Sequence, residues 1–80
     1  MKNIGKIFDF KDRQVVVLKS YNDEAESYEF HFLFDIENGV RAELKFGFDT
    51  ENARDKSFDK LDSKKVETTV NDVVNSLNSN

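Results

Sequence analysis

The chain has 80 residues, no cysteine, and a formal net charge of −4 from 16 acidic and 12 basic side chains. This length allows one domain, residues 1–80, with a small margin of stability because short chains bury a smaller share of their surface. The lack of cysteine excludes disulfides, a thiol nucleophile and a thiolate metal site, and the acidic balance gives no general attraction to nucleic acid or an anionic membrane.

The N-terminal segment MKNIGKIFDF contains two lysines but no apolar stretch of the kind found in secretory signals. No apolar run approaches the roughly 20 residues of a membrane span. We therefore expect a cytoplasmic protein without a membrane partner. The abundance of Lys, Asn and Asp, together with the absence of proline, is typical of a bacterial or phage protein.

Two strands are predicted near the start of the chain. Residues 4–10 (IGKIFDF) form the first, and residues 15–19 (VVVLK) are a β-branched run that is apolar on both faces. A strand with two apolar faces is expected inside a sheet rather than at its edge. Residues 11–13 connect the two strands, and residues 20–27 form a polar loop after them.

Residues 28–36 and 40–48 form the clearest pair of predicted strands, because large apolar side chains occupy the even positions of both. Asn38 and Gly39 between them indicate a hairpin. A two-residue loop would place apolar residues opposite charged ones, so we predict a three-residue loop, 37–39, with Gly39 at positive φ as the bulge residue. The expected cross-strand pairs are Ile36–Val40, Phe34–Ala42, Phe32–Leu44, Phe30–Phe46, Tyr28–Phe48 and, on the opposite face, Asp35–Arg41.

The last segment of the chain is predicted to form a helix, because five apolar residues recur along one helical face. Asp62 is placed to cap its N-terminus, with Leu61 and Val66 as a hydrophobic pair across the cap. Valine and threonine are weak helix formers, so this helix is expected to depend on packing against the sheet. The apolar stripe consists of Val66, Val70, Val73, Val74 and Leu77.

Between the hairpin and this helix the sequence favours no regular element. Residues 49–57 are polar and charged and are predicted to form a loop. Lys56–Leu61 (KSFDKL) is compatible with a short edge strand or with a single helical turn, and the two remain alternatives. The elements together predict an α+β fold: an antiparallel β-meander of three to five strands with one C-terminal α-helix packed on one face.

The aromatic row of residues 28–36 is interpreted as the core beneath that helix. One helix is about 10 Å wide and neighbouring strands lie about 4.8 Å apart, so a single helix shields about two strands. The remaining apolar area must be covered by Phe58 and Leu61, by curvature of the sheet, or by a second copy of the chain. A homodimer is therefore expected as one of these solutions.

No residue pattern in the chain predicts catalysis. His31, the only histidine, lies on the polar face of the hairpin near Glu29 and opposite Lys45, where a flat, solvated surface offers no cleft to a general acid or base. Glu29, His31 and Glu43 project to one side, but two carboxylates and one histidine are a generic ligand set. We predict no cofactor and no metal site.

Two segments have partial resemblances to nucleic-acid-binding families. KFGFDT (residues 45–50) resembles the central strand of an RNA-recognition motif, which implies base stacking on its aromatic residues. That fold needs a helix between its first two strands, and none is predicted here. SKKVETTVNDVV (residues 63–74) resembles the start of the last helix of double-stranded-RNA-binding domains, but the preceding helix of that family is not predicted. Lys64 and Lys65 stand in the first helical turn, where the helix dipole disfavours positive charge.

The sequence thus predicts a small non-enzymatic binding or regulatory protein that acts through contact with a protein partner. A phage or mobile-element inhibitor, an immunity-type protein and a housekeeping adaptor all fit this description. The alternative is binding of single-stranded DNA or RNA through the polar sheet face and the two lysines. The expected interaction surface consists of His31, Arg41, Glu43, Lys45, Lys64 and Lys65.

Overall fold

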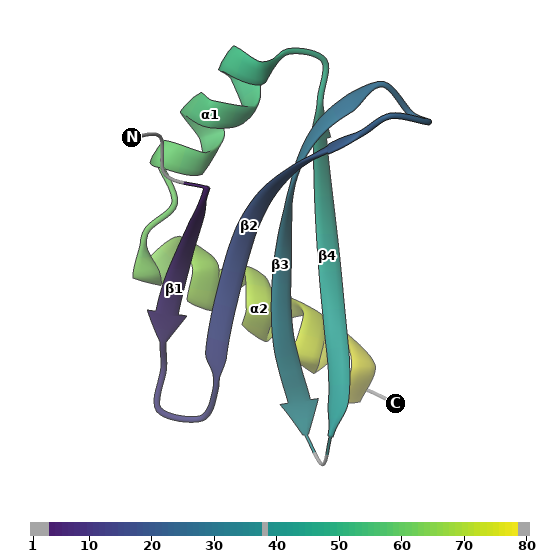
Figure 1. The fold of residues 1–80 in the computed structure, drawn as a ribbon. Helices are drawn as coiled ribbons and strands as arrows, with labels where there is room; N and C mark the ends of the chain where they lie inside the picture. The colour runs from purple at the N-terminus through teal and green to yellow at the C-terminus, as the bar shows by residue number, and fades with distance from the viewer. Residues whose placement is uncertain (1–3, 38, 79–80) are drawn as a thin grey trace.

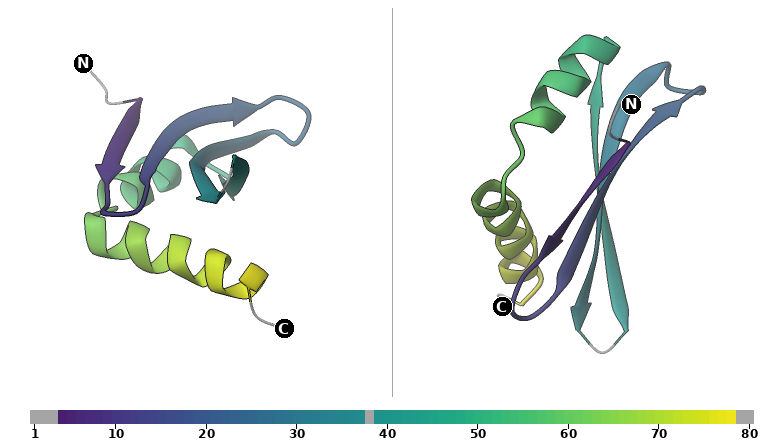
Figure 2. Two further views of the ribbon diagram at one scale, coloured as in Figure 1. Left: turned by 90° about the horizontal axis from the view of Figure 1, so that it is seen from below. Right: turned by 60° about the vertical axis from the view of Figure 1, so that its left-hand side comes forward.

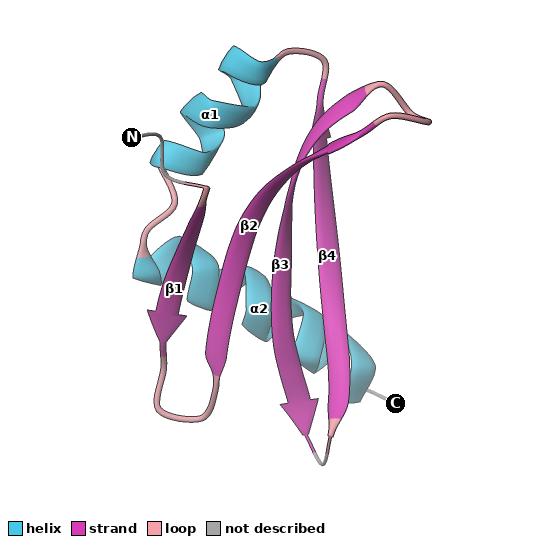
Figure 3. Ribbon diagram, viewed as in Figure 1, coloured by secondary structure: helices cyan, strands magenta, loops and turns pink. Residues whose placement is uncertain are grey.

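The computed structural model describes residues 4–37 and 39–78. These residues form one four-stranded antiparallel sheet in the order β1-β2-β3-β4, followed by two helices (Figure 1, Figure 3). The predicted α+β meander is confirmed, whereas the prediction of a single helix is wrong. The elements are β1 (Gly5–Asp9), β2 (Gln14–Asn22), β3 (Ser27–Glu37), β4 (Val40–Phe48), α1 (Glu51–Asp59) and α2 (Ser63–Asn78).

Both helices pack on the same face of the sheet (Figure 2). On that face the β3 side chains of Phe30, Phe32 and Phe34 are 4%, 1% and 4% exposed. The aromatic row is therefore core, as predicted, because alternate residues of a strand share one face. The other buried apolar residues come from β2 and the two helices: Val15, Val17, Phe58, Val66 and Val70.

The hairpin of β3 and β4 has the predicted register over most of its length. Phe34 lies opposite Ala42 and Asp35 lies opposite Arg41. Because directly opposed residues share a face, this register joins the two apolar rows on the helix side of the sheet.

The pairing next to the turn differs from the prediction. Glu37, and not Ile36, lies opposite Val40, and the register shifts between positions 35 and 37. Ile36 is therefore the extra residue of a bulge. Because the bulge inserts one residue into β3, the turn can be tight while the apolar rows of β3 and β4 still lie opposite each other. Gly39 has a φ of 79°, as predicted, but the bulge is in β3 rather than at this glycine. Asn38, within the predicted loop, lies outside the described residues.

The first helix, α1, forms where the sequence favours a loop, and it includes the first four residues of Lys56–Leu61. Thr50 caps the helix, because its Oγ1 accepts a hydrogen bond from the Ala53 backbone N–H at 3.1 Å. Arg54 and Phe58, four residues apart, are buried together against the sheet. The loop prediction fails because one large apolar side chain in nine residues produces no stripe.

The second helix, α2, has the predicted cap. Asp62 Oδ1 accepts a hydrogen bond from the Lys65 N–H at 2.8 Å, and the Asp62 carbonyl accepts one from the Val66 N–H at 3.0 Å. Val66 and Val70 are buried, but Leu77 is 63% exposed, so the stripe is covered only over its first part. The end of α2 extends beyond β4 (Figure 1, Figure 2). No helix in the described ranges is long and apolar enough to cross a membrane.

Candidate interaction surfaces

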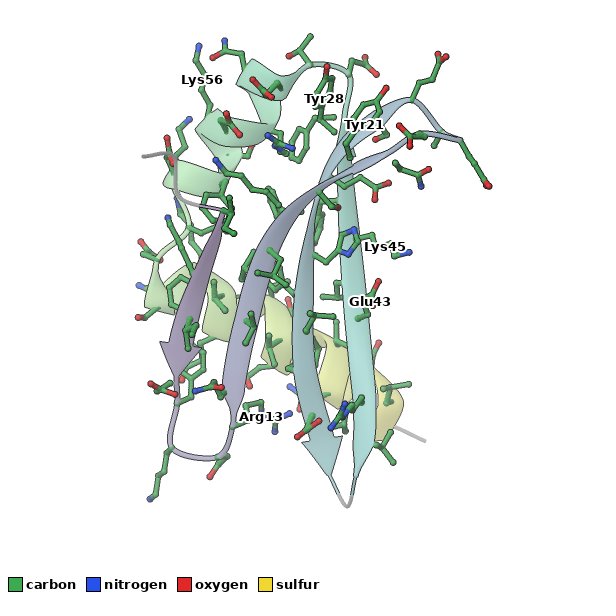
Figure 4. The ribbon with its side chains drawn as sticks, viewed as in Figure 1. Arg13, Tyr21, Tyr28, Glu43, Lys45 and Lys56 are labelled. Atoms are coloured by element: carbon green, nitrogen blue, oxygen red, sulfur yellow. The ribbon has the colours of Figure 1, made fainter. Side chains whose placement is uncertain are left out.

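The face of the sheet that carries no helix holds four of the residues expected to form an interaction surface. His31 lies opposite Lys45 in the paired strands β3 and β4. Glu43 and Lys45 project from the same face of β4, the face turned toward the viewer in Figure 4. Arg41 lies on this face as well, near the turn of the hairpin. Strand pairing therefore brings together side chains that the sequence places in two separate segments.

His31 is at the centre of a small polar network on this face. Its Nε2 lies 3.0 Å from Glu29 Oε1 and 3.0 Å from Ser20 Oγ, while its Nδ1 lies 3.5 Å from Glu43 Oε1. Glu43 Oε1 is also 3.5 Å from Lys45 Nζ. The hydrogen bond with His31 lowers the pKa of the Glu29 carboxyl from its ordinary value of 4.5.

The same geometry is unfavourable for a metal ion. Glu29 contacts one ring nitrogen of His31 and Glu43 contacts the other, whereas a metal ion would need both carboxylates on the side of a single nitrogen. Within the described residues, no group of three or more His, Cys, Asp or Glu side chains is arranged to hold a metal. The three side chains therefore form a polar network around the His31 ring.

Arg41 is also paired with a carboxylate. Its Nε lies 3.4 Å from Asp35 Oδ1, and both side chains are exposed, so this pair contributes little to stability. The neighbouring Arg13 donates from Nη1 to the Asp35 carbonyl oxygen at 3.1 Å, which ties the β1–β2 connection to β3. Positive and negative side chains thus alternate along this end of the face.

An apolar patch lies next to the polar network on the helix-free face. Ile7, Val16 and Leu33 are directly opposed across β1, β2 and β3, and Leu18 follows Val16 on the same side of β2. Ile7 is 63% exposed and Leu18 is 40% exposed. We name these four residues the outer patch. The two apolar faces of β2 are the sequence signal for it, although by themselves they indicate only an inner strand.

Lys64 and Lys65 lie on the other side of the molecule. They stand at the start of α2, on the rim of a groove of about 590 Å³ between this helix and the sheet. Lys65 Nζ donates to the Lys60 carbonyl oxygen at 3.2 Å. The six residues expected to form one surface are therefore divided between two. The groove is lined by Phe30, Phe32, Phe46, Leu61, Asp62, Lys64, Lys65, Thr68 and Thr69.

The buried cation Arg54 joins α1 to the sheet. Its Nη1 donates to the Ser20 carbonyl oxygen at 3.0 Å, and its Nε donates to Asp55 Oδ1 at 3.0 Å. Its guanidinium carbon lies 5.5 Å from the centre of the Tyr28 ring. Lys19 contacts the same Asp55 oxygen at 3.0 Å. These contacts anchor α1 and leave Arg54 little capacity to bind a ligand.

Comparisons of the chain with protein-family models, curated proteins and solved structures found no match.

Proposed function

We propose that this chain is a small non-enzymatic binding protein that contacts a protein partner through the helix-free face of its sheet. The observation that supports this proposal is the outer patch. Antiparallel sheets that face water on one side normally carry polar residues there. Here Ile7 and Leu18 are exposed beside Val16 and Leu33, across β1, β2 and β3 on that face.

Strand β2 carries apolar side chains on both of its faces, and only one of these faces is covered by the helices. Val15 and Val17 are fully buried under the helices, whereas Val16 and Leu18 point to the opposite side. A contiguous group of exposed aliphatic side chains on a soluble domain is characteristic of an interaction site. Both helices pack on the other face of the sheet, so burial of the outer patch requires a partner.

The surroundings of the outer patch suit a protein interface. The residues of the polar network, Glu29, His31, Glu43 and Lys45, border it as a polar rim. The turn between β2 and β3 curves away from the helices (Figure 2) and carries the exposed acidic residues Asp23, Glu24 and Glu26. The partner is therefore expected to present an apolar patch flanked by basic residues.

Binding of nucleic acid, the alternative function, has less support. The basic side chains on the helix-free face are accompanied by carboxylates: Arg41 by Asp35, and His31 and Lys45 by Glu43. Phosphate binding depends on cations that can exchange their counterions for the backbone. The acidic turn beyond this face would repel the same backbone.

The test uses the double variant Ile7→Ser/Leu18→Ser as bait in an affinity capture from cells that naturally contain the protein. Its matched control is Ile4→Ser, which changes a residue that is 75% exposed but lies outside the outer patch. A protein retained by the wild type and the control but lost with the double variant supports the proposal. Equal retention by all three, with unchanged melting temperatures, would refute it.

A second experiment addresses the alternative. Binding of labelled single-stranded DNA or RNA is measured at low salt, where counterion release favours it most. A salt-dependent complex that the Lys45→Gln variant weakens would favour nucleic acid over a protein partner.

A further inference from the structure

The edge of β4 is a second feature that the fold leaves open. Among residues 4–37 and 39–78, β4 is the last strand of the sheet and pairs only with β3, so alternate backbone groups along its outer edge have no strand partner within this part of the chain. The strand has nine residues and contains no proline, whereas β1 at the opposite edge has five. A long, regular edge is a template for a further strand.

We propose that two copies of this chain pair through β4, antiparallel and in register about Leu44, to form one eight-stranded sheet. When two copies of a strand pair across a two-fold axis, even-numbered residues must lie opposite even-numbered residues and odd-numbered opposite odd-numbered. Only then do the helix-covered faces of the two sheets lie on the same side. Leu44 is the midpoint of Val40–Phe48, so this register pairs all nine residues of the strand. The inference is independent of the partner proposed for the outer patch, which lies on β1, β2 and β3.

The charges of β4 select this register among its neighbours. Centred on Leu44, the pairing places Glu43 opposite Lys45 of the second copy, twice across the axis. A pairing centred on Glu43 would place Glu43 opposite itself and Arg41 opposite Lys45. A pairing centred on Lys45 would place Lys45 opposite itself. Opposite charges stabilise a cross-strand pair and like charges destabilise it, so the register about Leu44 is preferred.

The apolar side of β4 fits the same register. Leu44 meets Leu44, Ala42 meets Phe46, and Val40 meets Phe48 of the second copy. Each pair of unequal size places a small or branched side chain beside a large ring. Val40 and Phe46 are 54% and 38% exposed in the single chain, so pairing would cover apolar surface that the fold leaves open.

The end of α2 adds a contact from the second copy. It crosses β4 in the half of the strand nearest Val40 and extends past the edge (Figure 1). In the proposed register, that half lies beside the Phe46 end of the second β4. The 63% exposed Leu77 would then approach the groove over Phe46, Phe30 and Phe32 of the other copy. The groove is thus completed by a residue from the partner copy.

The test exploits the selected charge pair. Sedimentation equilibrium at low micromolar concentration is expected to give twice the 9.3 kDa mass of the chain for the wild type. Glu43→Lys and Lys45→Glu are each expected to give monomers, because like charges then face each other. The double variant Glu43→Lys/Lys45→Glu restores opposite charges and is expected to dimerise. An equimolar mixture of the two single variants is expected to form a heterodimer.

Several results would overturn the proposal. A wild-type monomer whose melting temperature does not depend on protein concentration would exclude the dimer. Single variants that dimerise as well as the wild type would exclude this register. Single variants that remain monomeric in the mixture, with normal circular dichroism spectra, would also contradict it. Ile7→Ser/Leu18→Ser is expected to remain dimeric, which separates this result from the test of the outer patch.

Discussion

Lys6 of β1 donates a hydrogen bond from Nζ to the carbonyl oxygen of Phe58 in α1 at 2.8 Å. The same ammonium lies 3.3 Å from the Leu61 carbonyl oxygen and 4.8 Å from the centre of the Phe58 ring. On the other side, Lys19 Nζ lies 4.7 Å from that ring. Lys6 therefore satisfies carbonyl groups at the C-terminal end of α1, where the helix dipole favours a positive charge.

Replacing Lys6 with methionine keeps an unbranched side chain, shorter by the terminal ammonium group, and removes its charge. The unfolding free energy is expected to fall by about 1 kcal/mol, because the carbonyl groups lose their partner and the dipole loses its counter-charge. Lys11→Met, in the exposed β1–β2 connection, is the matched control and is expected to change stability little. Urea denaturation of both variants measures the difference, and equal losses would show that the contact is not stabilising.

Phe32→Ala is expected to destabilise the domain by about 3–5 kcal/mol, because it leaves a cavity under both helices. Phe32 is 1% exposed, and a loss of this size is a large share of the stability of a small domain. Tyr21→Ala, at a ring that is 48% exposed, is expected to cost clearly less. Thermal unfolding followed by circular dichroism distinguishes the two. A Phe32→Ala variant with the wild-type melting temperature would show that Phe32 is not core.

The contact of Asp55 with Lys19 predicts a specific dependence of stability on pH. The hydrogen bond from Lys19 lowers the pKa of the Asp55 carboxyl from its ordinary value of 3.8. Its stabilising contribution is therefore complete above pH 3.8 and is lost as the pH falls through the lower pKa of the folded state. The difference in unfolding free energy between the wild type and Asp55→Asn is expected to be largest near neutral pH and to shrink in acid.

Asp23→Asn, at an exposed position of the β2–β3 turn, controls for the loss of one negative charge in that experiment. Urea denaturation at neutral pH and at several values below pH 3.8 provides the comparison. A difference that stays constant across this range would contradict the assigned role of Asp55.

Asp62→Ala is expected to lower the unfolding free energy by about 1 kcal/mol, because the Lys65 N–H then loses its acceptor at the start of α2. Asp72→Ala, an exposed position within the same helix, is expected to change stability by less than about 0.5 kcal/mol. Urea denaturation of the two variants separates the cap from the general effect of removing a carboxylate. Equal effects would mean that the cap is not stabilising.

Local residue patterns are sufficient to predict much of the strand pairing in the sheet and the position of α2. The alternation of residues 28–36 and 40–48 decides which side chains share a face, and matching the two apolar rows predicts the pairs from Tyr28–Phe48 to Asp35–Arg41. The bulge lies at Ile36 and not at Gly39 as predicted, because a bulge at Ile36 and a longer loop produce the same register farther along the strands.

The candidate surfaces were predicted only in part. The register was sufficient to bring His31, Glu43 and Lys45 together on one face. The separation of Lys64 and Lys65 from them depends on how α2 docks, which no local pattern specifies. The outer patch was missed because an apolar residue on β2 is equally consistent with burial under a helix or exposure beside one.

Contacts within and between neighbouring strands, as well as the cap and the apolar stripe of α2, can be derived from the amino-acid sequence alone. These features depend on periodicity over a few residues. The existence of α1, the face of β2 that the helices cover and the exposed strand edge depend instead on contacts between distant parts of the chain. Arg54 of α1 is buried because it donates a hydrogen bond to the Ser20 carbonyl oxygen, 34 positions away in the sequence. Lys6 donates to the Phe58 carbonyl oxygen at the C-terminal end of α1, 52 positions away. Interactions at such separations form only when the chain has folded, so they leave no local pattern.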